Sequence, residues 1–185
     1  AGGRIANEQV KMAPPDGQTL LMTPVASMSI YPHSYAGMLR YDPFKDFVPV
    51  AHLANFQLGF GVQAQVPART LADYVAWVKQ DPQAHGFYAS AASGSLPHFF
   101  GVMFARSVGV QLTHVPYKGT APAMQALASG EVSAVSTVVA DIRPLVAAGK
   151  ARLLAAAGAR RDPAFPDVPT FKELGHALGA EPWDA

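Results

Sequence analysis

The chain has 185 residues, half of them hydrophobic, and its 14 basic and 13 acidic residues leave a formal net charge of +1. This length can bury one good core, or two smaller cores joined at a hinge. The near-neutral balance argues against nucleic-acid binding through a basic field, and apolar stretches such as 99–105 are far shorter than the roughly 20 residues of a membrane span. The chain has no cysteine, which excludes disulfides and thiolate chemistry.

The first third of the sequence predicts one helix followed by extended segments. Residues 4–12 show a helical pattern that stops before Pro14-Pro15-Asp16-Gly17, a strong turn signal. The segment 30–45, with its prolines and tyrosines, is expected to be a long surface connection. Strands are expected over 19–22, 47–54 and 58–63.

The clearest helix spans residues 70–80. Its apolar residues recur at the spacing of one helical face, Thr70 is a plausible N-cap with Asp73 in the first turn, and Asp81-Pro82 ends it. A strand–turn–helix unit then recurs, and such a series implies a mostly parallel sheet with helices on its faces. The strands are expected over 86–90, 110–115, 132–138 and 151–157, with helices over 95–108, 120–129 and up to 148. Thr170 and Glu173 form a capping-box pattern that predicts one more helix.

The stretch 88–98 combines a strand, a run of small residues and a helix start. Small side chains let a ligand approach the backbone, and Pro97 fits the first helical turn because its missing N–H would have no partner there. The free N–H groups and the positive end of the helix dipole favour an anion. A tight turn that binds nothing is the alternative. The predicted ligand contacts here are Ser90, Ala91, Ser93, Gly94 and Ser95.

Two more turns are candidates for the same site. Gly119 and Thr120, with Pro122 close behind, repeat the pattern of a cap and an early proline. Parallel strands bring both helix starts to one end of the sheet, where such folds bind ligands. After the first expected strand, Thr23 and Ser27 would present hydroxyls to the same cleft. A well-capped helix and an ordinary loop are the alternative interpretations.

Hydrolytic, metal and dinucleotide chemistry have weaker support. The six histidines include no pair at helical metal spacing and no HExxH motif, so neither metal nor cofactor is expected. Ser95 and His98 would suit a nucleophile and base, but Ser95 is outside a G-x-S-x-G elbow and no acid nearby in sequence would orient His98. His98 is better interpreted as a packing residue or ligand contact. The segment 59–64 matches G-x-G-x-x-A but leads to Pro67 instead of a helix, so dinucleotide binding is rejected.

Short segments over nearly the whole chain carry a family resemblance. They are AGG at 1–3, APPDGQTLLM at 13–22, YDPFKDF at 41–47, the stretch 88–98, HVPYKG at 114–119, AGKAR at 148–152 and FPDVPT at 165–170. In this order and spacing they resemble the tripartite tricarboxylate transporter substrate-binding family, also called the Bug receptors.

The resemblance implies an α/β fold of the periplasmic-binding-protein type II kind, with two lobes of mostly parallel sheets flanked by helices. One lobe would be residues 65–154, and the other would combine 1–64 with 155–185, so that two crossovers form the hinge. The family's signal peptide, first strand and glycine-rich carboxylate-binding loop would precede Ala1, and the family would continue beyond Trp183.

The resemblance also implies a function. Family members bind small organic acids in the periplasm and hand them to membrane permease subunits, or signal their presence to a sensor protein. We therefore expect a receptor and not an enzyme, with no nucleic-acid partner and no membrane span of its own. The alternatives are a small serine hydrolase using Ser95 and His98, and a ligand-sensing subunit of a signalling system.

The chain departs from the family pattern at two places in this site. The turn that is usually rich in glycine has Ala89, Ala92 and Ser93, whose side chains narrow the approach to the backbone. The strand that often carries an aspartate facing the ligand has Ser136 and Thr137. Thr137 is thus a predicted ligand contact that cannot neutralise an ammonium group, which leads to the hypothesis of a ligand without a free amine.

Overall fold

The computed structural model describes residues 3–176 and residue 178. Contacts divide the chain into two compact units, and each is described by itself. Unit 1 contains residues 1–53 with 94–96, and unit 2 contains residues 54–93 with 97–185. The lobe boundaries predicted from the sequence stay a prediction.

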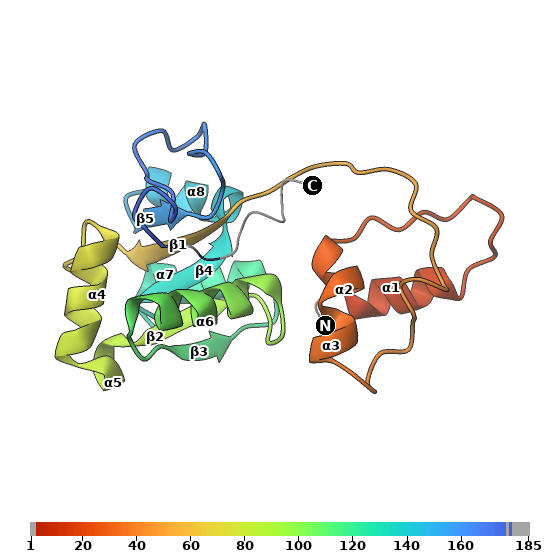
Figure 1. The fold of residues 1–185 in the computed structure, drawn as a ribbon, viewed down its shortest axis with the longest axis horizontal. Helices are drawn as coiled ribbons and strands as arrows, with labels where there is room; N and C mark the ends of the chain where they lie inside the picture. The colour runs from red at the N-terminus through yellow and green to blue at the C-terminus, as the bar shows by residue number, and fades with distance from the viewer. Residues whose placement is uncertain (1–2, 177, 179–185) are drawn as a thin grey trace. The chain divides into compact units, whose positions relative to one another are not determined.

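Unit 1 consists of three short helices joined by irregular chain (Figure 1). The helices are α1 (Arg4–Lys11), α2 (Val25–Ser29) and α3 (Tyr31–Ser34). The helix predicted over 4–12 is confirmed to within one residue. Lys11 ties α1 to the following loop, because its ammonium lies 2.9 Å from the Asp46 carboxylate and donates to the Arg40 carbonyl at 2.9 Å.

The predictions of strands over 19–22 and 47–54 are wrong. Most apolar side chains in these segments are exposed, with 72% to 85% of the surface accessible at Leu20, Met22, Val48 and Val50. A strand needs a neighbour to satisfy its backbone N–H and C=O groups, and the described part of unit 1 offers none. Composition therefore predicted strands for which the described residues provide no pairing partner.

Unit 2 is built on one five-stranded sheet with the strand order β3-β2-β4-β1-β5. The strands are β1 (Leu58–Gln63), β2 (Phe87–Ser90), β3 (Thr113–Pro116), β4 (Ala134–Val138) and β5 (Ala151–Ala156). β2 is parallel to both β3 and β4, whereas β1 is antiparallel to both β4 and β5. Four strands thus share one direction and β1 opposes them. The expected α/β fold is confirmed. The sheet is mixed, because the reversal of β1, which the sequence pattern did not reveal, makes two of its four strand pairs antiparallel.

The helices of unit 2 follow the expected series closely. They are α4 (Leu71–Gln80), α5 (Pro82–His85), α6 (Leu96–Val108), α7 (Thr120–Ser129) and α8 (Val139–Ala147). The predicted cap of α4 is a complete capping box, in which the Asp73 N–H donates to Thr70 Oγ1 at 3.1 Å and the Thr70 N–H donates to the Asp73 carboxylate at 2.9 Å. The same two bonds form between Thr170 and Glu173, but the residues after Thr170 form turns and not the expected helix.

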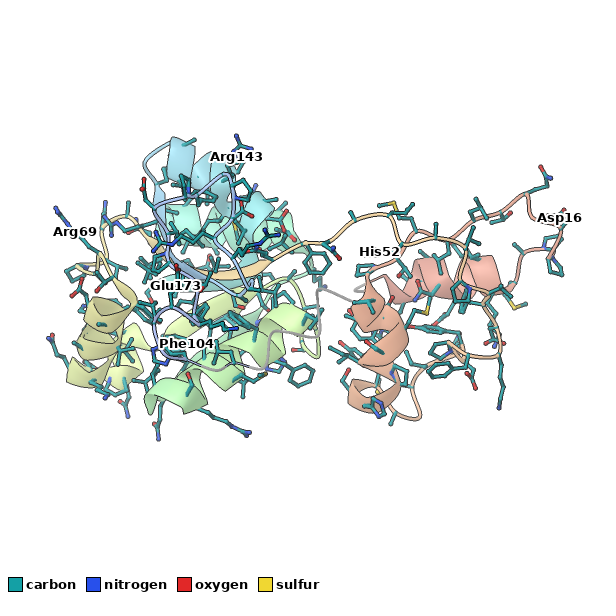
Figure 2. The ribbon with its side chains drawn as sticks, turned by 45° about the horizontal axis from the view of Figure 1, so that its top comes forward. Asp16, His52, Arg69, Phe104, Arg143 and Glu173 are labelled. Carbon is teal, nitrogen blue, oxygen red and sulfur yellow. The ribbon has the colours of Figure 1, made fainter. Side chains whose placement is uncertain are left out.

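The two faces of the sheet carry different cores. α7 and α8 cover one face with small and aliphatic side chains, including Leu127, Val135 and Ile142. The other face carries aromatic rings: Phe60 lies 4.6 Å from Phe104 between ring centroids, and Figure 2 shows Phe104 inside this unit. Gly61 of β1 permits this layering, because a Cβ there would lie 2.2 Å from the Ile142 side chain of α8. The rejected dinucleotide motif is therefore a packing feature of β1.

Candidate ligand-binding site

Four strands end at one edge of the sheet in unit 2. Because β4 and β5 are both antiparallel to β1, β5 runs in the same direction as β2, β3 and β4. This edge, here called the carboxyl edge, contains the strand ends Ser90, Pro116, Val138 and Ala156. Open α/β sheets bind ligands outside such an edge. The prediction that the turns after β2 and β3 share one end of the sheet is confirmed.

The loops after β2 and β3 stay paired beyond their strands. The Tyr117 N–H donates to the Ser90 carbonyl at 2.9 Å, and the Gly119 N–H donates to the Ala91 carbonyl at 2.9 Å. Gly119 has a φ of 116°, in the region that favours glycine. These bonds bring Ser90, Ala91 and Gly119 together. They also occupy the Gly119 N–H, so a ligand contact of Gly119 would use another atom.

The Ser90 side chain is bonded to the loop that follows β2. This side chain is fully buried, and its hydroxyl donates to the Ala92 carbonyl at 3.2 Å and lies 2.7 Å from Nε2 of His114 on β3. Both partners belong to unit 2. The hydroxyl of this predicted ligand contact is therefore occupied within the fold, and its contact with a ligand stays a prediction.

His98 and His114 form a stacked pair at this edge. Their ring centroids lie 4.0 Å apart, and the Tyr88 hydroxyl donates to the His98 carbonyl at 2.9 Å. Burial and the neighbouring His98 lower the pKa of His114 to about 4, and burial also lowers the pKa of His98. Both rings are therefore neutral at pH 7. His98 packs against His114, and its contact with a ligand stays a prediction. Sequence reasoning gave His114 no role although it begins the segment 114–119.

Asp141 is a residue of this edge that sequence reasoning missed. It lies in the first turn of α8, four residues after Thr137, and the side chains of Thr137 and Thr120 lie near its carboxyl. Burial raises the pKa of this carboxyl by more than the nearby threonines lower it. An acidic group thus lies close to two predicted ligand contacts. The available signal was an acidic residue just after the expected strand 132–138.

The start of α7 differs from the prediction. Gly119 is the N-cap, whereas Thr120 is already helical, and no side chain caps this helix. The Thr120 side chain lies near the Asp141 carboxyl instead of capping the helix.

Ser93, Gly94 and Ser95 lie in the turn before α6. Ser93 is exposed, Gly94 is half-buried and Ser95 keeps 8% of its surface accessible. Ser95 directly precedes the helix, as expected for a cap position, and Gly94 has a φ of 71°. Their role as ligand contacts stays a prediction.

Unit 1 brings together the other two predicted contacts, Thr23 and Ser27. Their hydroxyl oxygens lie 2.6 Å apart, the Thr23 hydroxyl lies 3.2 Å from the Asn7 side-chain oxygen, and the Ser27 hydroxyl lies 2.8 Å from the Pro24 carbonyl, so that two hydroxyl hydrogens are shared among three contacts. Ser27 is buried and Thr23 is half-buried. The two hydroxyls therefore stabilise the junction of α1 and α2, and their contact with a ligand stays a prediction.

Other parts of the described chain are less suited to an organic acid. An open groove with a volume of about 410 Å³ lies along α4 and is lined mainly by apolar side chains, including Leu71, Val75 and Val108. It contains none of the predicted ligand contacts. Among the described residues, no group of three or more histidine, aspartate or glutamate side chains is placed to hold a metal ion.

Comparison with known families decides the relationship of this chain. All of its residues, 1–185, match the family described as "Tripartite tricarboxylate transporter family receptor". The chain belongs to this receptor family. The resemblance inferred from seven short segments is thereby confirmed.

Individual receptors of this family agree in sequence and fold. The chain is 37% identical over 175 residues to a protein of Cupriavidus necator described as "UPF0065 protein in gbd 5'region", covering 95% of this chain and 52% of that relative. Rpa4515 of Rhodopseudomonas palustris with adipate superposes with a TM-score of 0.88 at 34% identity, covering 95% of this chain and 58% of that one. MatC of the same organism, with bound malate, gives 0.83 at 32%, covering 97% and 60%. The chain thus spans about half the length of the relatives it matches.

Proposed function

We propose that this receptor captures a small carboxylate by closing two lobes around it and delivers the acid to a tripartite tricarboxylate-type membrane permease. The observation that carries the proposal is the carboxyl edge of unit 2, where the loops after β2 and β3 and the start of α8 meet. The ligand is bound and released unchanged.

The carboxyl edge offers dipoles and hydroxyls to an acid. α7 begins at this edge, and the first N–H groups of a helix carry a partial positive charge that favours an anion. The exposed Ser93 adds a hydroxyl, and the exposed Lys118 is the basic residue of the neighbouring loop. Preformed donors of this kind hold a carboxylate without a buried charge clamp, and lobe closure would exclude water from it.

Relatives and residues together indicate the class of ligand. The solved receptors with adipate and with malate support a dicarboxylate. Asp141 adds a constraint, because its carboxyl would repel a second carboxylate nearby and attract a hydrogen-bond donor. The hypothesis of an amine-free ligand depended on Thr137 being uncharged. Since Asp141 places an acidic group beside Thr137, acids that carry an amine or hydroxyl are included in the proposed class.

Family membership supports the remaining parts of the proposal. These are a periplasmic location, a permease as the partner, and lobes formed by residues 65–154 and by 1–64 with 155–185. In the described part of the chain, no helix is long and apolar enough to cross a membrane. A pull-down of the complete receptor with membrane extracts, with and without the acid, would distinguish a permease partner from a sensor.

Calorimetric titration of the complete receptor tests the binding proposal. The ligands are adipate, malate, succinate, aspartate and benzoate, with the uncharged diamide of succinate as the negative control. We expect at least one acid to bind and the diamide not to bind. The variant Ser93→Asp should lower the affinity for the acid by roughly tenfold or more through charge repulsion, whereas the matched neutral variant Ser93→Asn should leave the affinity unchanged. Binding of no acid, or equal affinities of the two variants, would contradict the proposal.

A further inference from the structure

We propose that His114 is a positioning residue that sets the shape of the ligand-binding loop through Ser90. The inference rests on the proposed function, because the loop 91–95 that follows Ser90 contains predicted carboxylate contacts. His114 lies on β3, adjacent to β2 in the sheet, and it contacts Ser90, the residue that precedes the loop.

The hydrogen bonds of Ser90 determine which nitrogen of His114 carries the proton. A serine hydroxyl has a single hydrogen, and the Ala92 carbonyl, 3.2 Å away, can only accept it. Nε2 of His114 lies 2.7 Å from the same hydroxyl oxygen, and with the hydroxyl hydrogen directed at Ala92 we assign Nε2 as the donor in that contact. The neutral ring is thus the Nε2–H tautomer, and a relay of two bonds runs from His114 through Ser90 to the Ala92 carbonyl.

Neighbouring rings hold the imidazole in the orientation that this relay needs. His98 from α6 stacks on it with ring centroids 4.0 Å apart, and Tyr88 from β2 packs at 5.2 Å. The Tyr88 hydroxyl donates to the His98 carbonyl, which links the first turn of α6 to β2. Packing therefore joins three elements around one donor, so that the position of Nε2 does not depend on the loop it controls.

The relay matters for binding because it directs carbonyl oxygens away from an acid. The Ala92 carbonyl is bonded to Ser90, and the Ala91 carbonyl is bonded to the Gly119 N–H. A carbonyl oxygen that turned toward a bound carboxylate would repel it. Without the Nε2–H donor, the buried Ser90 hydroxyl would lose a partner, and it could turn its hydrogen away from Ala92 to regain one. The loop would then have more than one arrangement, and binding would have to select one of them.

Three variants of the complete receptor separate the donor from the ring. His114→Phe keeps an aromatic ring against His98 but removes the donor, His114→Gln keeps an N–H donor without the ring, and Ser90→Ala removes the middle of the relay. With adipate and malate as probes, we expect roughly tenfold weaker binding for His114→Phe and for Ser90→Ala. The double variant should be no weaker than either single variant, because both interrupt one relay. His114→Gln should recover most of the affinity.

A matched control uses the other stacked histidine of unit 2. The ring of His85 stacks on Trp77 with centroids 3.8 Å apart, and its Nδ1 lies 2.8 Å from the Trp77 carbonyl. His85→Phe removes a comparable polar contact outside the relay and should leave the affinity unchanged. Wild-type affinity in His114→Phe, or additive losses in the double variant, would overturn the proposal.

Measurements on the ligand-free receptor test the relay independently of ligand binding. Nitrogen-15 NMR of the histidines in the ligand-free receptor should show His114 as the Nε2–H tautomer, and the amides of 91–95 should exchange roughly tenfold faster in Ser90→Ala. The Nδ1–H tautomer at His114, or unchanged exchange in Ser90→Ala, would overturn the inference even if His114→Phe failed to fold. If the wild-type receptor bound no acid, the proposed function would fail, while the tautomer and the exchange rates would still decide the relay.

Discussion

Unit 2 pairs its strands in one sheet and buries two clusters of apolar side chains, whereas the described part of unit 1 has no strand and exposes many of its apolar side chains. The five strands of unit 2 pair in one sheet between an aliphatic core and an aromatic core. The described part of unit 1 has three short helices and no strand, and it leaves side chains such as Phe44 90% exposed. Strand-forming composition becomes a strand only where a neighbouring strand accepts its hydrogen bonds.

The two units also treat the predicted ligand contacts differently. In unit 1, the Thr23 and Ser27 hydroxyls bond to each other and to nearby groups of the same unit. In unit 2, Thr120 and Thr137 lie near the Asp141 carboxyl, so that a titratable group accompanies the predicted contacts at the carboxyl edge. The predicted contacts are therefore joined to one another in unit 1 and lie beside an acidic group in unit 2.

The largest expected difference in the free energy of unfolding is between variants of one phenylalanine from each unit. Phe104 is fully buried against Phe60 and Phe171, so Phe104→Ala should lower the free energy of unfolding by about 3–5 kcal/mol. Phe44 is exposed, so Phe44→Ala should change it by less than about 0.5 kcal/mol. Urea unfolding of the 185-residue chain measures both. Similar losses from the two variants would show that unit 1 has a core that its exposed side chains do not reveal.

A smaller contrast compares two threonines. Thr70 caps α4, and Thr70→Ala should cost about 1 kcal/mol because the Asp73 N–H loses its acceptor. Thr19 is exposed in a segment of unit 1 without regular structure, and Thr19→Ala should cost less than about 0.5 kcal/mol. The same urea experiment compares them. A neutral Thr70→Ala would mean that helix α4 is held by packing alone.

Acid should weaken unit 2 through His114. Its pKa in the folded chain is about 4, below the ordinary value of 6.5, so the unfolded chain binds a proton more readily. This contribution to stability is complete above about pH 6.5 and is lost as the pH falls toward 4. Urea midpoints at pH 7, 5.5 and 4 should fall more steeply for the wild type than for His114→Gln.

Local patterns were sufficient to predict most of unit 2. The boundaries of β1 match the predicted 58–63, and the Thr70 and Asp73 pattern forms the expected capping box, because both depend on residues close in sequence. The reversed direction of β1 was not predictable, since it depends on which distant strands lie beside it. The strands predicted over 19–22 and 47–54 failed for the same reason, because hydrophobic pattern carries no information about pairing partners.

The candidate site was predictable in place and less so in detail. Parallel strand–helix units predicted that Ser90 and Gly119 would share one edge, and they do. The partners of each hydroxyl were not predictable. Thr120 was expected to cap α7 but is already helical, and the Ser90 hydroxyl bonds to the Ala92 carbonyl and lies beside Nε2 of His114. These bonds join residues on different elements, whose side-chain directions depend on how the helices pack.

The smallest expected change in stability comes from a pair of aspartates, one in each unit. The two substitutions are expected to change the free energy of unfolding in opposite directions. A backbone bond from Asp42 and the Lys11 ammonium lower the pKa of Asp46 in unit 1, so its charged form stabilises the fold above the ordinary value of 3.8 and Asp46→Asn should destabilise it at pH 7. Burial raises the pKa of Asp141, so its charge opposes folding as the pH rises past 3.8, and Asp141→Asn should stabilise the chain slightly at pH 7.

In the complete receptor, Asp141→Asn should also strengthen binding of succinate relative to aspartate, because the repulsion of a carboxylate and the attraction of an amine both disappear. Urea midpoints at pH 7 and calorimetry with the two acids measure these effects. If Asp141→Asn destabilised the chain and left the ratio of the two affinities unchanged, Asp141 would be a helix-start residue like Asp73 and would have no part in selecting the ligand.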